Sequence, residues 1–98
     1  MTSAAHALSV TCERHGDGYR CEVRVGDDAA ATRHQVAFDR TELQELAPEA
    51  TPEDLVRAAF DYLLEHEPRE SILRAFELDV IGRYFPGWQD AVRERLAS

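Results

Sequence analysis

A chain of 98 residues, 44% apolar and 31% charged, has the composition of a single folded domain and leaves no room for a second one. Nineteen acidic residues against eleven arginines give a net charge of −8, which argues against a monomer that binds nucleic acid or an anionic membrane through overall charge. No apolar run reaches the roughly 18 residues of a membrane span. We therefore expect one cytoplasmic domain over residues 1–98, with a frayed N-terminus at residues 1–6.

The first forty residues alternate between apolar and polar side chains, which is the period of β-strands with one buried face. Three such segments are separated by short turns rich in Gly and Asp, at residues 8–14, 19–25 and 32–38. Glycine supplies the positive φ that a tight hairpin turn requires. The pattern predicts a three-stranded antiparallel meander whose apolar face must be covered by other elements.

The rest of the chain has helical spacing and supplies that cover, so the predicted fold class is α+β. Thr41 and Gln44 fit a capping box, and Thr51 followed by Pro52 is a strong helix start. Apolar residues then recur at steps of four, interrupted near Pro86. These signals predict helices near residues 41–47, 52–66, 69–76, 79–85 and 88–97, packed against the meander.

Negative charge is concentrated in the helical part of the chain. Residues 1–40 hold six acidic residues and five arginines, whereas residues 41–98 hold thirteen acidic residues and six arginines. The outer face of the sheet is therefore expected to be comparatively basic.

The two cysteines lie on the predicted inner face of the first hairpin. If the hairpin closes over residues 16–17, Cys12 lies directly opposite Cys21, at a separation that a disulfide tolerates. Closure over residues 17–18 would keep both on the same face but offset them. Reduced cysteine packs as a small apolar residue, and a cytoplasmic compartment keeps thiols reduced. Two reduced thiols are thus the favoured interpretation, and a cross-strand disulfide is the alternative.

Sequence motifs for catalysis, cofactors and metals are not found. No serine lies in a Gly-x-Ser-x-Gly turn, and the five glycines form no phosphate-binding loop. His34 could join Cys12 and Cys21, but that set lacks a fourth protein ligand for zinc unless His6 supplies it, and a structural histidine is favoured. We expect no catalytic residue, no cofactor and no metal ion, and we interpret the chain as a non-enzyme.

Two surfaces are candidates for binding a protein partner. One is an aromatic cluster beside a Pro-Gly turn, where Tyr and Trp offer large contact areas with polar tips, although burial in the protein's own core is favoured for them. The other is the third strand, which would be an unpaired sheet edge and would also permit a homodimer. We predict a non-catalytic protein-binding or regulatory module that acts through the sheet edge or through the cluster Arg83, Tyr84, Phe85 and Trp88.

Residues 32–66 run strand, short helix, turn and capped amphipathic helix, the last being TPEDLVRAAFDYLLEH. This order resembles the ribbon-helix-helix repressors, a family that includes many antitoxins. The resemblance implies that the strands of two chains pair and that alternate outward residues, here Arg33 and Gln35, read bases in the major groove. A dimeric DNA-binding regulator or antitoxin is therefore the alternative function.

Overall fold

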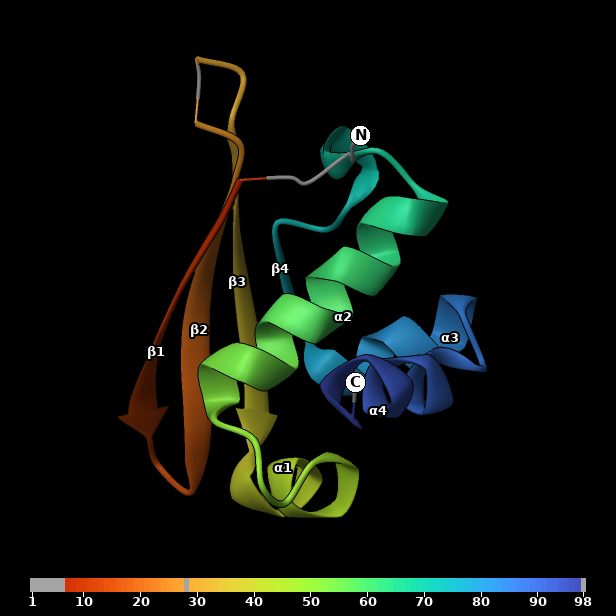
Figure 1. Ribbon diagram of the computed structural model, residues 1–98. Helices are drawn as coiled ribbons and strands as arrows, with labels where there is room; N and C mark the ends of the chain where they lie inside the picture. Colours follow the sequence, from red (N-terminus) through yellow and green to blue (C-terminus); the bar gives the residue numbers. More distant parts are fainter. Residues whose placement is uncertain (1–6, 28, 98) are drawn as a thin grey trace.

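Four strands form one sheet, and the helices lie against one of its two faces (Figure 1). The computed structural model describes residues 7–27 and 29–97; the terminus expected to be frayed, 1–6, lies outside the described residues. The sheet has the order β1-β2-β3-β4, and the predicted α+β class is confirmed. The elements in chain order are β1 (Leu8–His15), β2 (Gly18–Val25), β3 (Thr32–Asp39), α1 (Arg40–Leu46), α2 (Pro52–His66), the 3-10 turn η1 (Arg69–Ser71), β4 (Ala75–Glu77), the 3-10 turn η2 (Leu78–Val80), α3 (Ile81–Tyr84) and α4 (Trp88–Ala97).

The antiparallel meander forms as predicted, with each strand one residue longer than expected. The hairpin closes over residues 16–17, so Cys12 is the direct partner of Cys21. Gly16 has a φ of 59°, which glycine adopts without the steric cost that other residues meet. The apolar residues of β1, β2 and β3 alternate onto the face covered by helices, and the polar ones onto the outer face.

The helix caps are partly as expected. α2 begins as predicted, because the Thr51 hydroxyl accepts a hydrogen bond from the Asp54 amide at 3.1 Å. α1 begins one residue earlier than expected, and its cap is Asp39 rather than Thr41. The Asp39 carboxylate accepts from the Glu42 amide at 3.0 Å, and the Glu42 carboxylate accepts from the Asp39 amide at 3.1 Å. This reciprocal pair is a capping box that joins the end of β3 directly to α1.

The helix predicted over residues 69–76 is wrong. Only residues 69–71 make a helical turn; the chain then extends, and β4 pairs in parallel with β3. The Gln35 amide donates to the Arg74 carbonyl at 2.8 Å, which attaches this segment to the sheet. The helix expected over 79–85 is also shorter, because residues 78–80 form a 3-10 turn that leads into α3.

The free edge expected at the third strand is wrong for the same reason. β3 pairs with β2 on one side and with β4 on the other, so β4 is the edge strand on this side of the sheet. A homodimer or a two-chain ribbon formed through β3 would have to displace β4, whose pairing involves Gln35.

α2 lies at the centre of the core. Phe60 is fully buried there, with its ring centroid 5.3 Å from that of His34 and 6.1 Å from that of Phe76. Phe60 thus packs against both the meander and the segment that carries β4. The radius of gyration is 12.8 Å, close to the roughly 13 Å of a compact domain of this length. No helix in the described part of the chain combines the length and apolar character needed to cross a membrane.

Candidate functional site

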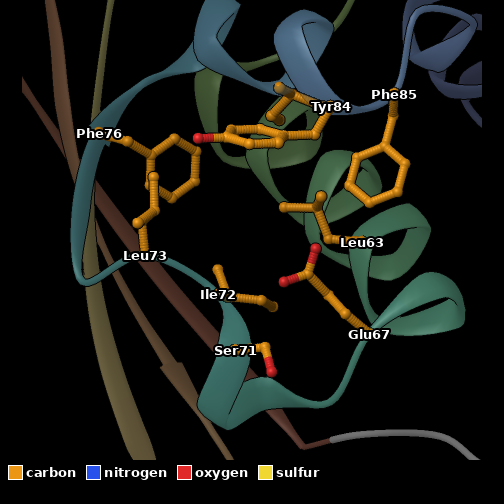
Figure 2. A pocket seen from close by; sticks show the side chains of 9 residues that line it. Leu63, Glu67, Ser71, Ile72, Leu73, Phe76, Tyr84 and Phe85 are labelled. Atoms are coloured by element: carbon orange, nitrogen blue, oxygen red, sulfur yellow. The ribbon is translucent and has the colours of Figure 1, made fainter.

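An apolar groove opens between the C-terminal half of α2, residues 71–76 and the end of α3 (Figure 2). Its cavity volume is about 280 Å³. Leu63 from α2, Ile72 and Ile81 are buried side chains that line it. The groove lies where residues 72–77 run extended beside α2 instead of forming the expected helix.

The rim of the groove carries exposed apolar surface. Leu73 is 49% exposed and Tyr84 is 67% exposed, and these are the exposed large apolar side chains among the described residues. Both line the groove together with Phe76 and Phe85, and the Tyr84 ring lies across the opening toward Phe76 (Figure 2). Isolated exposed apolar residues are ordinary, but two that border one apolar groove mark a surface suited to binding.

Two polar residues lie at one end of this apolar lining, Glu67 and Ser71. The Glu67 carboxylate is half-buried and points into the groove (Figure 2). It is the one charged side chain that lines the groove, and within residues 7–27 and 29–97 it has no hydrogen-bond or ion-pair partner. A few polar groups in an apolar groove fix the orientation of what binds there.

Contacts behind the groove hold the wall formed by Phe85. The Phe85 ring lies edge-on to Tyr62 at 5.9 Å between centroids, and 5.2 Å from the His66 ring. The guanidinium of Arg95 in turn lies over the Tyr62 ring, 5.8 Å from its centroid. The same guanidinium donates to the Glu65 carboxylate at 2.5 Å. These contacts hold the Phe85 ring in place on one side of the groove.

His34 holds the opposite wall. Its Nδ1 is 2.8 Å from the Leu73 carbonyl, which can only accept, so Nδ1 carries the proton and the neutral Nε2 accepts from the Thr32 hydroxyl at 2.9 Å. Burial lowers the pKa of His34 below its ordinary 6.5, since desolvation disfavours the charged ring; the nearby Arg74 acts in the same direction, and the bond to Leu73 opposes it. The neutral imidazole, with both ring nitrogens hydrogen-bonded, thus fixes the backbone of Leu73, whose side chain forms one rim of the groove.

The structure separates the predicted aromatic cluster into exposed and buried members. Tyr84 and Phe85 line the groove, and Arg83 is exposed beside them. Trp88 is 3% exposed and belongs to the core, as the favoured interpretation expected, so it does not contribute to an exposed interaction surface. A Cβ atom on Gly82 would lie 3.2 Å from the indole Nε1, which shows how closely α3 packs on Trp88.

Arg33 and Gln35 are exposed on the outer face of the sheet, the face that no helix covers (Figure 1). They line a hollow of about 370 Å³ on that face. The cysteines form a disulfide between Cys12 and Cys21, with Cα atoms 4.0 Å apart, rather than the reduced thiols that were favoured.

The groove residues that sequence reasoning missed lie between α2 and α3: Glu67, Ser71, Leu73 and Phe76. They were missed because a helix over residues 69–76 would bury its apolar side chains in the core and expose its polar side chains to solvent. Pro68 ends α2 and favours an extended residue before it, but it does not determine the conformation of residues 69–76.

Comparison with protein-family models, with curated proteins and with solved structures finds no match for this chain. The groove and the outer-face hollow are therefore the basis on which a function is proposed.

Proposed function

We propose that this protein is a non-catalytic binding module that captures a short segment of a partner protein, with an apolar side chain of that segment inserted in the groove. The observation that carries the proposal is that Leu73 and Tyr84, the exposed large apolar side chains of the described chain, border one groove with a buried apolar floor. Aromatic and apolar anchors that fill such grooves supply most of the energy of protein–protein contacts.

The groove is at the small end of the range of binding sites, which suits an inserted side chain. Small-molecule sites usually enclose about 300–1,000 Å³ and bury most of the ligand. At about 280 Å³, this groove suits one or two apolar side chains that reach in from outside.

The charge of the groove selects the sequence of the partner segment. Glu67 is the one charged lining residue and is unpartnered among the described residues, so a cation next to the apolar anchor would complete its bonding. We therefore propose a leucine or aromatic anchor with an arginine or lysine beside it. The excess of acidic residues over 41–98 would speed the encounter with such a segment.

The edge of the sheet supplies a second element of recognition. β4 is the edge strand on this side, and its Phe76 lines the groove, so the backbone edge and the groove adjoin. An extended segment could pair with the free backbone groups of β4 while its anchor enters the groove, as in strand addition to other sheets. A sheet edge, here β4 rather than the third strand, and the aromatic surface would then act together.

A selection from random displayed peptides tests this proposal. The wild-type protein is expected to enrich peptides with a leucine or aromatic residue beside arginine or lysine. Glu67→Lys should reverse the charge preference to acidic while keeping the apolar anchor, because the anchor does not touch the exchanged charge. The matched control is Glu49→Lys, at an exposed site just before the N-terminal end of α2. This variant should still prefer peptides with a basic residue beside the anchor. Enrichment of the same peptides by the wild type and Glu67→Lys would contradict the proposal.

A further inference from the structure

We propose a second binding site, on the outer face of the sheet, that takes the terminal phosphate of a phosphate monoester. It is independent of the groove, since it lies on the face of the sheet that the helices leave uncovered (Figure 1). Three arginines, Arg24, Arg33 and Arg74, line one hollow there of about 370 Å³.

The strand register forces two of these arginines together. Arg24 of β2 is the direct antiparallel partner of Arg33 of β3. Directly opposed residues on one face of a sheet have Cβ atoms about 4.5–5.5 Å apart, and two like charges in that position are destabilising. Since a dianion between them would turn this repulsion into attraction, the pair is better suited to binding than to stabilising the sheet.

The third arginine comes from a segment distant in sequence. The Arg74 carbonyl accepts from the Gln35 amide at 2.8 Å, which fixes the backbone of Arg74 beside β3, and its side chain lines the same hollow. Within the described residues, the side chains of Arg24, Arg33 and Arg74 make no hydrogen bond and no ion pair. All three guanidinium groups are thus available to a ligand.

The charges in the hollow match a phosphate monoester. Three guanidinium groups and the carboxylate of Glu22 leave an excess of two positive charges. A monoester carries about −1.5 to −2 and offers three acceptor oxygens, which arginine binds in bidentate fashion. Thr11 and Gln35 add a hydroxyl and an amide donor. A nucleic-acid backbone distributes single charges along its length and is a poorer match to this compact site on a chain of net charge −8.

Titration with O-phosphoserine, followed by NMR shifts of the backbone and arginine side chains, tests the site. Saturable shifts at the hollow are expected, with none for serine. Arg33→Ala and Arg24→Ala should each weaken binding roughly tenfold, since each removes a charge-assisted contact. Glu22→Gln should strengthen it severalfold, because it removes the one repulsive charge. Arg14→Ala, an exposed arginine of β1 outside the hollow, is the control and should bind as the wild type does.

Two further arms identify the source of the phosphate. Tighter binding of a phosphoserine peptide than of O-phosphoserine would assign the site to a phosphorylated protein, and equal binding would assign it to a free phosphate ester. The proposal is overturned if Arg24→Ala and Arg33→Ala bind O-phosphoserine as the wild type does, if serine binds equally well, or if duplex DNA binds more tightly than either phosphoserine probe. Because these variants lie on the outer face, thermal melting should show them folded.

Discussion

The meander of residues 8–39 and the segment of residues 67–87 fold in different ways. The meander consists of three eight-residue strands joined by short turns, whereas the segment contains four short elements, none longer than four residues. The strands are specified by local alternation and by a continuous ladder of backbone bonds. The segment is held by single long-range contacts to the sheet, such as those of His34 and Gln35. The difference teaches that the irregular part of the fold, where packing is incomplete, is also where the groove forms.

The largest expected effect comes from removing the side chain that supports both regions. Phe60→Ala leaves a cavity beside His34 and Phe76 and should lower the free energy of unfolding by about 3–5 kcal/mol. Urea unfolding followed by the fluorescence of Trp88, the one tryptophan, measures it. A loss below about 1 kcal/mol would show that α2 does not couple the two regions as described.

Reduction of the disulfide should affect the meander selectively. The bond closes a short loop, with a sequence separation of 9, so the loss of stability is expected to be about 2–3 kcal/mol from chain entropy. Melting with and without reductant measures the total, and hydrogen exchange should show the loss in β1 and β2 first. Equal melting temperatures in the two conditions would contradict a stabilising role for the Cys12–Cys21 bond.

His34→Ala should act on the other region. It leaves the Leu73 carbonyl without its side-chain donor and should cost about 1–3 kcal/mol. Amide exchange is expected to accelerate at residues 72–77 more than in the β1–β2 hairpin. Uniform acceleration across the sheet would mean that His34 does not act locally on the groove wall.

The same histidine gives the fold a dependence on pH. Because the pKa of folded His34 lies below its ordinary 6.5, the unfolded chain binds the proton first as the pH falls. The contribution of His34 is therefore complete above about pH 6.5 and is lost as the pH falls through the lowered folded pKa. His34→Gln, which cannot titrate, should show a flatter stability profile over this range; a profile as steep as the wild type's would assign the effect to other groups.

Sequence reasoning predicted the parts of the molecule whose structure follows from local patterns. The extents of the three meander strands to within one residue, the start of α2 at Thr51 and the extent of α4 needed no knowledge of distant contacts. The register of Cys12 with Cys21 was one of two that the sequence left open. The 69–76 segment could not be predicted in this way, because Ile72 and Phe76, four residues apart, point toward the core in the extended chain as they would in a helix. Its conformation is decided by hydrogen bonds to β3.

The candidate site was predicted only in part, for the same reason. Tyr84 and Phe85 were found from their aromatic character, while Leu73 and Glu67 acquire their roles only when the extended segment places them around the groove. The choice between burial and exposure for Trp88 depends on how α3 packs, which no local pattern fixes.

The smallest expected effect on stability belongs to the groove rim itself. Leu73→Ser and Tyr84→Ser change exposed side chains and should each alter the free energy of unfolding by no more than about 0.5 kcal/mol. A larger loss, measured by urea unfolding, would make these residues structural rather than part of a binding surface.

The affinity of a selected peptide for these two variants tests the central claim most directly. The probe is a peptide selected on the wild type, with its apolar anchor beside an arginine, and its affinity is measured by isothermal titration. Leu73→Ser and Tyr84→Ser are each expected to bind it at least roughly tenfold more weakly, as when anchor contacts are removed at other interfaces. Gln44→Ser, an exposed change in α1 away from the groove, should leave the affinity as it is. Wild-type affinity in both rim variants, with the proteins folded, would contradict the assignment of the groove as the binding surface.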